Sequence, residues 1–476
     1  MGTETLNTEA MEAATLITGD GVKTPVDTGY GLRQNVLSPM ETLAQSISTI
    51  APSTSAALTI PLVFTLAGQG TCAAYVIAML AMFLVAMCIA VFARDSASPG
   101  SLFMYTRTNL PAGFAAITAW ALLFAYVMTA ASVIGGFLNY SYVFLGAYGK
   151  YVPSAVLVLV AAGGAMWIAY RDVKISARMM LCIEAVSVCL IAVVIGCTLW
   201  RHGLHVDMTQ IQLKGASLPA VSMGGMLAIF SFVGFESATT LGTEAREPLK
   251  TIPRALLLSA LLSGTFFVIC AYGEVMGFHG SHETLGQSAA PLRYLAQQAG
   301  IGLVGPVIDA GVLVSMFAAT LGCVIAAGRL LMLMAHHGLV HRVFAKTHSR
   351  NETPALASVL AGLLAAAPVA IVAERGASGA EIYGWMGALA VFGFLTAYAL
   401  ATVAMTQHLR HRARLKFKWI ALAMGAILAI AAAMVGTLFP VPPAPYRYFP
   451  YVYAAYLLAG CGWYAVTRLR AARVSG

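Results

Sequence analysis

The stretches IAPSTS (residues 50–55) and SFVGFES (residues 231–237) each interrupt a long apolar run near the middle of a predicted membrane crossing. In the first, Pro52 removes a backbone hydrogen-bond donor and disfavours helical geometry in the residue before it. In the second, Gly234 permits the backbone to leave the helix. Proline kinks are common in membrane helices and are often purely structural. Two breaks at matching places in the chain instead indicate the midplane binding site of a transporter.

The composition requires a lipid environment. Of the 476 residues, 59% are hydrophobic, 10% are charged and 45 are glycine. A soluble domain carries far more charge because its surface faces water, whereas helices in lipid approach one another closely through small residues. The net charge is +9, and the Lys and Arg residues cluster in short polar segments between apolar runs. This placement is typical of membrane topology and argues against nucleic-acid binding. The eight cysteines follow no paired spacing and are expected to pack without disulfides.

Twelve apolar stretches are long enough to cross a bilayer, since a spanning helix needs about 20 residues. The sequence therefore predicts an all-α membrane protein with 12 transmembrane helices. They lie at about 42–66, 71–93, 113–146, 153–170, 176–199, 219–244, 254–278, 303–335, 355–373, 381–407, 417–438 and 451–468. The predicted parts are a disordered cytoplasmic tail at 1–40, five-helix units at 41–199 and 219–409, two further helices in 417–468, and a cytoplasmic tail at 469–476.

The basic residues set the expected orientation. With the N-terminus placed inside, 22 of the 28 Lys and Arg residues fall in inner segments and 6 fall in outer loops. Cytoplasmic loops of membrane proteins carry this excess of Lys and Arg. Both termini are therefore expected in the cytoplasm, in a multi-pass protein of the plasma or inner membrane.

The two interrupted helices are the first and the sixth of the twelve, so each opens a unit of five helices. An odd number of helices per unit turns the second unit upside down relative to the first. Interrupted helices at corresponding positions of two inverted halves mark the substrate site of secondary transporters. The sequence thus predicts a 5+5 inverted repeat with a binding site at the two breaks.

Several segments resemble one transporter family. The segment SFVGFESATTLGTEAREPLKTIPRA (231–255) is similar to the sixth helix and following loop of the amino acid–polyamine–organocation transporters. AGRLLMLMAHHGL (327–339) and TPALA (353–357) resemble the end of that family's eighth helix and the loop after it. SPGSLFMYTRTNL (98–110) and RDVKISAR (171–178) resemble its first two inner loops. The resemblance covers essentially all of the chain except the tails.

This resemblance implies the leucine-transporter-type fold. In that fold, helices 1–5 and 6–10 form inverted repeats, helices 11 and 12 are peripheral, and the substrate lies between broken helices 1 and 6. One departure is visible, because the family's usual Gly-Ser-Gly at the first break is Pro52-Ser53-Thr54 here. Fewer glycines leave less bare backbone for a substrate carboxylate to approach.

Backbone groups released from helical bonding in lipid need other partners, and a zwitterionic ligand supplies them. The amides at 53–55 open the second half of helix 1, where the partial positive charge of a helix start suits a carboxylate. Carbonyls at both breaks suit an ammonium group, and within the family they match amine-binding positions. Phe230 matches a gating aromatic, with simple packing as the alternative. The predicted substrate-binding residues are Ile50, Ser53, Thr54, Ser55, Phe230, Val233, Gly234 and Glu236.

Glu236 directly follows the second break. A carboxylate at the membrane midplane costs about 2.5–3.5 kcal/mol on insertion scales, so it usually marks a functional group or a satisfied pair. It either caps the second half of helix 6 or faces the pocket. In the pocket it would bind a cationic side chain and favour a basic amino acid or polyamine. The sequence leaves both roles open.

Glu184 lies in the apolar stretch MMLCIEAVSVCLI, where burial disfavours the ionised form. It is the predicted proton-coupling residue, with a neutral, hydrogen-bonded acid as the alternative. Some proton-coupled relatives resemble this segment but place a lysine at this position. A sodium mechanism is less favoured, because Phe317-Ala318-Ala319-Thr320 offers one hydroxyl where sodium-coupled members of the fold use two.

The remaining ionisable residues have expected structural or gating roles. Glu274 and Asp309 lie near outer helix ends, where they either serve an extracellular gate or stay solvated. Glu244, Arg246 and Glu247 are expected to form ion pairs at the inner end of helix 6. The ten histidines lie in loops or helix ends and are not expected to bind a metal. Because nucleotide-binding and nucleophile motifs are absent, neither a cofactor nor enzyme activity is expected.

The sequence therefore predicts a secondary transporter that moves a small amino acid by alternating access. Protons are the expected coupling ion and the lipid bilayer is its environment. An exchanger of a basic amino acid or polyamine for a related amine is the alternative. A sensor that binds an amine without moving it is the third hypothesis.

Overall fold

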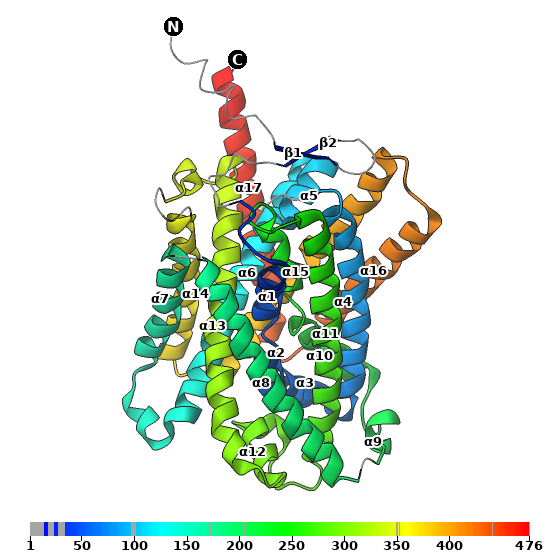
Figure 1. Cartoon of the computed structure of the whole chain (residues 1–476), viewed down its shortest axis with the longest axis vertical. Helices are drawn as coiled ribbons and strands as arrows, with labels where there is room; N and C mark the ends of the chain where they lie inside the picture. The colour runs from blue at the N-terminus through cyan, green and yellow to red at the C-terminus, as the bar shows by residue number, and fades with distance from the viewer. Residues whose placement is uncertain are drawn as a thin grey trace.

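The computed structural model describes residues 14–17, 23–26, 34–96, 101–171, 173–203, 205–348, 351, 353–439 and 441–475. In this part of the chain the protein is a bundle of long helices with one two-stranded sheet (Figure 1). Strands β1 (Ala14–Ile17) and β2 (Lys23–Val26) pair antiparallel in the N-terminal tail. The other residues before 34 lie outside the described part, so the disorder of this tail stays a prediction.

The helices fall into two halves of the chain. The first half contains α1 (Pro39–Ile50), α2 (Pro52–Thr54), α3 (Ile60–Ala67), α4 (Thr71–Ala93), α5 (Ser101–Asn109), α6 (Ala112–Leu145), α7 (Ser154–Arg171), α8 (Val173–Arg201) and α9 (Met208–Ile211). The second half contains α10 (Leu218–Phe230), α11 (Pro248–Gly277), α12 (Pro291–Gln298), α13 (Gly305–His336), α14 (Ala355–Glu374), α15 (Gly379–His411), α16 (Phe417–Gly436) and α17 (Phe449–Ser475). A π-helix spans Ser55–Thr59, and 3-10 helices span Gly68–Gly70, Gly146–Tyr151, Phe235–Leu241, Leu285–Gln287, Gly302–Val304, Arg342–Ala345 and Tyr446–Tyr448.

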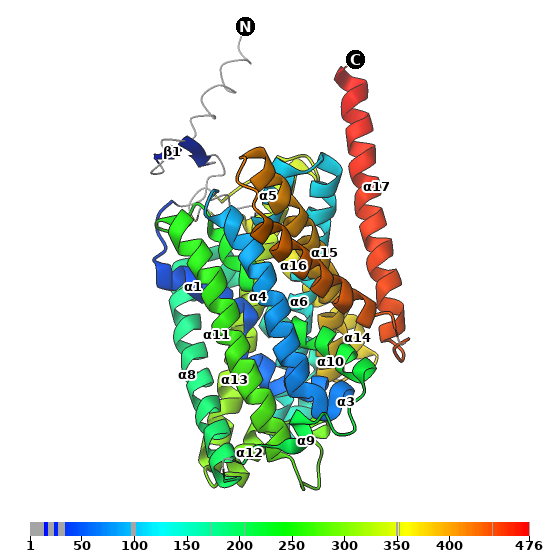
Figure 2. The same ribbon diagram turned by 90° about the vertical axis from the view of Figure 1, so that its right-hand side faces the viewer.

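Ten runs of helix in the described residues are long and apolar enough to cross a membrane. The prediction of an all-helical, multi-pass membrane protein is thereby confirmed. The first run, Pro39–Ala93, contains 55 residues, which is more than twice what one crossing needs. α17 is not among the ten, although it runs lengthwise along the margin of the bundle (Figure 2). The number of twelve crossings stays a prediction.

The bundle has two distinct end faces. The β1–β2 sheet, α5 and the end of α17 lie at one end, which we call the tail face (Figures 1 and 2). The short helices α9 and α12 lie at the opposite end, which we call the lid face. α12 packs against α8 and α13 and also contacts the π-helix Ser55–Thr59. It therefore covers the part of helix 1 that follows the first break.

Helix 1 is broken where the sequence predicts. α1 begins with a capping box, in which the Ser38 hydroxyl accepts from the Glu41 amide and the Glu41 carboxylate accepts from the Ser38 amide at 2.8 Å. It ends at Ile50, and the next residue, Ala51, is left-handed with a φ of 49° and a ψ of 68°. Pro52 starts α2, and the turn then widens into the π-helix. The residue before the proline thus lies outside the right-handed helical region, which a following proline disfavours.

Helix 6 is broken at Gly234. α10 ends at Phe230, a turn follows, and a 3-10 helix runs over Phe235–Leu241. Gly234 has a φ of +95°, and a Cβ there would lie 2.4 Å from Cγ2 of Thr49. Both the backbone angle and the close approach of helix 1 therefore require glycine at this position.

The two breaks contact each other directly. The Ser46 hydroxyl donates to the Phe235 carbonyl at 2.6 Å and accepts from the Ala238 amide at 3.2 Å. The Ser237 hydroxyl donates to the Thr49 hydroxyl at 3.1 Å. Side chains of helix 1 thus satisfy backbone groups that the break in helix 6 releases, and the two helices are held together inside the bundle.

α6 and α15 form a scaffold behind the breaks. A Cβ at Gly393 of α15 would lie 2.4 Å from the Ala121 carbonyl of α6, and one at Gly135 of α6 would lie 2.7 Å from Ile382 of α15. Glycines therefore set the close packing of these two helices, as is usual for helices in lipid.

Candidate functional site

The predicted substrate-binding residues converge between helices 1 and 6. Each of them is buried, so the site is closed to both faces in this structure. The residues are Ile50, Ser53, Thr54, Ser55, Phe230, Val233, Gly234 and Glu236. Buried polar groups need hydrogen-bond partners, and the partners of these residues define what the site can do.

Glu184 caps the second half of helix 1. The Ser53 amide donates to Oε1 of Glu184 at 2.8 Å, and the Ser53 hydroxyl donates to Oε2 at 3.2 Å. The Ser315 hydroxyl of α13 also donates to Oε2. The carboxyl group therefore lies at the start of a half-helix, where the partial positive charge suits an anion. It links α8 to helix 1 and to α13.

Two of the three amides expected for a substrate carboxylate are engaged in this closed state. The Ser53 amide is bound by Glu184, and the Ser55 amide donates to the Ala51 carbonyl at 3.1 Å. The Thr54 hydroxyl lies 3.5 Å from the Ser315 hydroxyl. A carboxylate of the protein thus occupies the position that the sequence suggests for the carboxylate of a substrate.

Ser315 is a site residue that the sequence analysis does not identify. It is the first hydroxyl side chain of α13 and lies two residues before the stretch considered for sodium, and that isolation is the signal in the sequence. Thr320, the hydroxyl of that stretch, donates to the Met316 carbonyl of its own helix at 2.9 Å. Within the described residues there is no group of three or more His, Cys, Asp or Glu placed to hold a metal ion.

Glu236 is held by two tyrosines of the scaffold. The Tyr126 hydroxyl of α6 donates to Oε1 at 2.7 Å, and the Tyr398 hydroxyl of α15 donates to Oε2 at 2.6 Å. Both carboxylate oxygens are therefore engaged in this state. The contacts anchor the second half of helix 6 to the scaffold. The two tyrosines are a further part of the site that sequence analysis misses, because a tyrosine in an apolar helix has no periodic signal.

Aromatic side chains close the site. The Phe230 ring lies 5.6 Å from the Tyr383 ring in an edge-to-face arrangement, and it packs on Gly387, where a Cβ would lie 2.7 Å from the ring. The Tyr383 hydroxyl is 2.7 Å from that of Thr59 on helix 1. The Tyr75 hydroxyl of α4 is 2.9 Å from that of Ser231 at the second break. Hydrogen bonds and ring packing thus join helices 1 and 6 to α15 and α4.

Two ion pairs lie on either side of the breaks. Toward the tail face, Arg329 of α13 donates to both oxygens of Glu244, at 2.8 and 3.1 Å, and both side chains are buried. The amide of Leu37 donates to the Glu244 carbonyl at 2.8 Å, which ties the segment before α1 to the same place. Toward the lid face, Arg293 of α12 pairs with Asp309 of α13.

Glu274 lies on the lid side of α11 and is fully buried. Neither of its carboxylate oxygens has a hydrogen-bond partner in the described part of the chain. One oxygen of Asp309 is likewise without a partner among the described residues. A buried ionised carboxylate without partners is costly, so Glu274 is a buried polar group that the contacts among the described residues leave unsatisfied.

The ion pairs expected at the inner end of helix 6 are confirmed in part. Glu247 pairs with Lys250 at 2.9 Å, and the hydrogen bond from that ammonium group lowers the pKa of the Glu247 carboxyl. Arg246 instead donates to the Asn35 carbonyl at 3.2 Å.

A second charge cluster surrounds Asp95 on the tail face. Partial burial raises the pKa of Asp95, but a hydrogen bond from His408 at 2.9 Å and the nearby charges of Arg412 and Arg414 outweigh it, so the pKa lies below its usual value. The cluster links the loop after α4 to the end of α15.

Comparison with known proteins places this geometry in context. A family model described as amino acid permease matches residues 42–469. The branched-chain amino acid permease BcaP of Bacillus subtilis is 25% identical over 322 residues, which are 63% of this chain and 67% of that protein. BcaP of Lactococcus lactis is 25% identical over 343 residues, covering 66% of this chain and 71% of that protein.

Two further matches widen the comparison. The vacuolar cationic amino acid transporter 2 of Arabidopsis thaliana is 25% identical over 322 residues, covering 63% of this chain and 49% of that protein. Among solved structures, a manganese transporter of Eremococcus coleocola superposes with a TM-score of 0.53 at 14% identity, covering 91% of this chain and 94% of that one. At that identity the likeness bears on the fold alone.

Proposed function

The chain belongs to the amino acid permease family and has the leucine-transporter-type fold, and on that premise we propose that it carries a small amino acid across the cytoplasmic membrane by alternating access, coupled to protons. Membership of the family makes it a transporter and not an enzyme. The observation that carries the proposal is the meeting of two broken helices around buried polar groups, with Glu184 bonded to the start of the second half of helix 1.

The proposed topology has twelve crossings in a 5+5 inverted repeat plus two peripheral helices. The run Pro39–Ala93 is long enough for two crossings, and α17, with 27 residues, is long enough for one more. The tail face carries both the β1–β2 sheet and the end of α17 (Figure 1). Together with the excess of Lys and Arg in the predicted inner segments, this supports a cytoplasmic tail face and an outer lid face.

The proposed substrate is a small amino acid with a neutral side chain. Its ammonium group bonds to backbone carbonyls at the two breaks, those of Ile50, Phe230 and Val233, in the manner of half-helix sites in other transporters. Both oxygens of Glu236 are engaged by tyrosines, which leaves no free carboxylate there for a cationic side chain. The Phe230 ring then covers the bound molecule as a gate.

Protons and substrate are coupled through Glu184 in this proposal. In its ionised form, Glu184 occupies the half-helix start that a substrate carboxylate needs. Protonation makes its oxygens weaker acceptors, so the Ser53 amide becomes available to the substrate. Each ligand then favours the binding of the other, and by thermodynamic linkage this coupling is reciprocal. A proton gradient can therefore drive accumulation.

The two ion pairs on either side of the breaks are the proposed gates. The pair of Arg329 and Glu244 closes the tail face, and the pair of Arg293 and Asp309 holds α12 over the lid face. Alternating access requires that they open in turn. Glu274, whose carboxylate oxygens have no hydrogen-bond partner among the described residues, belongs to the outer gate in this scheme.

The test is uptake of labelled L-leucine into proteoliposomes under an imposed inward proton gradient. Uptake by the native protein should rise with the gradient, and Glu184→Gln should take up substrate without that dependence. Glu283→Gln, which changes an exposed residue of the outer loop, is the matched control and should behave as the native protein. Undiminished dependence on the gradient in Glu184→Gln would remove Glu184 from the mechanism.

Exchange of a basic amino acid or polyamine for a related amine is the second candidate. The observation in its favour is the similarity to transporters named for cationic amino acids. Uptake of L-arginine that requires internal amine and is indifferent to pH would support it over proton symport. Saturable binding of an amine without flux would instead support a sensor.

A further inference from the structure

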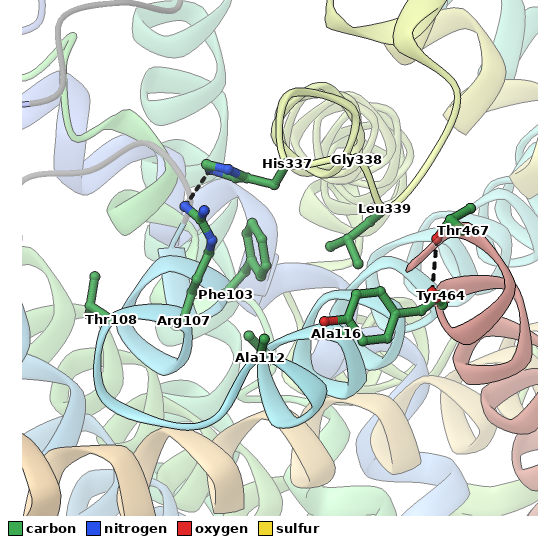
Figure 3. A pocket seen from close by; sticks show the side chains of 11 residues that line it. Phe103, Arg107, Thr108, Ala112, Ala116, His337, Gly338, Leu339, Tyr464 and Thr467 are labelled. Atoms are coloured by element: carbon green, nitrogen blue, oxygen red, sulfur yellow. Dashed lines mark hydrogen bonds between the residues drawn. The ribbon is translucent and has the colours of Figure 1, made fainter. Parts of the chain in front are cut away.

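A cavity of 520 Å³ opens where α5, α6, α13 and α17 meet on the tail face (Figure 3). It lies away from the two breaks, and the proposed transport cycle does not use it. Arg107 and His337 lie together at one side of the cavity, and Leu339 and Tyr464 lie at the other. The cavity is therefore polar on one side and largely apolar on the other.

The lining of the cavity marks the level of the membrane surface. Ala112 is the first residue of one candidate span, and His337 directly follows the last residue of another. Thr467 ends the apolar part of α17, after which the sequence continues as RLRAARVSG. Three separate helices thus change from apolar to polar at the cavity. This is the depth at which the headgroup of a membrane lipid lies.

Arg107 supplies an available positive charge at this depth. Its Nη1 donates to Nε2 of His337 at 3.2 Å, and no carboxylate lies within 4.0 Å of it in the described part of the chain. A guanidinium group has five N–H donors in a planar fork that matches phosphate geometry. One bond to His337 leaves the others available for a phosphate.

The opposite wall suits the start of an acyl chain. Ala115 and Ala116 of α6 and Leu339 after α13 are buried apolar residues that line the cavity. On α17, Trp463 and Val466 adjoin the lining residues Tyr464 and Thr467 in sequence and are exposed by 53% and 46%, so that helix presents apolar groups to its surroundings. A soluble anion would gain nothing from these walls, whereas a phospholipid contacts both sides at once.

We propose that this cavity binds an anionic phospholipid, with its phosphate on Arg107 and its first acyl carbons against the alanines of α6. Basic pockets between membrane helices on the cytoplasmic side are suited to such headgroups. The assignment to the inner leaflet rests on the proposed topology, whereas the binding itself does not depend on transport. The lipid would also join α17 to the bundle at the tail face.

The experiment measures lipid retained by the purified full-length protein in native mass spectrometry, titrated with dioleoyl phosphatidylglycerol or dioleoyl phosphatidylcholine. The native protein should retain phosphatidylglycerol in preference. Arg107→Gln should reduce that retention about fivefold, the size expected for one cation near the membrane surface. Arg410→Gln, an exposed arginine at the end of α15, is the control with the same change of charge and should retain lipid normally.

A second variant tests the shape of the cavity without altering charge. Ala112 is exposed and lines the cavity, so Ala112→Trp should fill it and lower phosphatidylglycerol retention as well. Equal retention of both lipids by the native protein, or normal phosphatidylglycerol retention by Arg107→Gln, would overturn the proposal. So would full displacement of the lipid by millimolar inorganic phosphate, since the site would then be one for free anions. Uptake of L-leucine is measured with the same variants, so that a failure of the lipid proposal can be distinguished from a failure of the transport proposal.

Discussion

Replacement of Gly234 by alanine should strain the break in helix 6 in two separable ways. Gly234 has a φ of +95°, and a residue with a Cβ loses about 1–2 kcal/mol in the left-handed region. The added Cβ would also lie 2.4 Å from Cγ2 and 3.2 Å from the backbone carbon of Thr49. Overpacking of this kind costs about 1–3 kcal/mol. Gly234→Ala should therefore lose about 2–5 kcal/mol of unfolding free energy.

The assay is denaturant unfolding of the purified protein in mixed micelles, with uptake measured in parallel. Gly225→Ala is the matched control, because it lies in α10 and an added Cβ there meets nothing within 4 Å. Helix propensity alone predicts that this control gains up to about 1 kcal/mol. Combining Gly234→Ala with Thr49→Ser removes the methyl group of the shortest contact but keeps the hydroxyl that accepts from Ser237.

The double variant should recover the part of the loss that comes from the contact, and the rest should remain as backbone strain. If Gly234→Ala has the same free energy of unfolding as Gly225→Ala and transports normally, the close packing of the two breaks does not require glycine at position 234. The description of helix 6 would then be refuted.

Three further variants test other contacts. Tyr398→Phe should lower the free energy of unfolding by about 1.5–3 kcal/mol, the contribution of a hydrogen bond to a charged group. The loss should be smaller when Glu236 is already replaced by Gln, and an equal loss in both backgrounds would contradict the contact between Tyr398 and Glu236. Asp95→Asn should destabilise the protein at about pH 7 and by less at about pH 3. The folded-state pKa of Asp95 is depressed, so its carboxylate stabilises the fold above the unfolded pKa, and that contribution declines as the pH falls toward the folded pKa. Melting curves that differ equally at both pH values would contradict this. Arg329→Gln should cost about 3–5 kcal/mol by leaving Glu244 buried without its partner, and the paired change of both residues to Gln should restore part of the loss in a urea titration.

The breaks could be predicted from sequence because their cause is local. Pro52 restricts the residue before it, and the structure places the break at Ala51. Gly234 is required by its own backbone angle as well as by its neighbour. The lengths of the longest helices were predictable for a similar reason, since hydropathy acts along one segment: α6 covers Ala112–Leu145 where the apolar run is 113–146.

The partners at the site could not be predicted in the same way. Glu184 and Ser315 are 131 residues apart, and Tyr398 is 162 residues from Glu236. Nothing along the chain shows which apolar helix will face another. A single hydroxyl or carboxyl in an apolar helix can face lipid headgroups, a neighbour or a cavity, and only the packing of α6, α13 and α15 decides among them.

Because tertiary contacts cannot be read along the chain, the sequence singles out Glu236 as the residue at the break, whereas in the structure it is Glu184 that bonds to the break in helix 1. Glu236 stands at the break and looked equally suited to a cap or a ligand, yet both of its oxygens are held by phenols from other helices. Glu184 lies far from the break in sequence but bonds to the first amide after it. The distinction is one of tertiary contact, which composition and periodicity do not encode.

Coupling of proton and substrate through Glu184 is tested most directly by measuring how many protons the protein takes up when an amino acid binds. Calorimetric titration of the purified protein with L-leucine, repeated in buffers of different ionisation enthalpy, gives that number without requiring flux. Coupling through Glu184 predicts uptake of about one proton per molecule bound by the native protein and none by Glu184→Gln, since the bound carboxylate replaces an ionised Glu184 at the Ser53 amide. Binding without proton uptake by the native protein, or equal uptake by the variant, would contradict it.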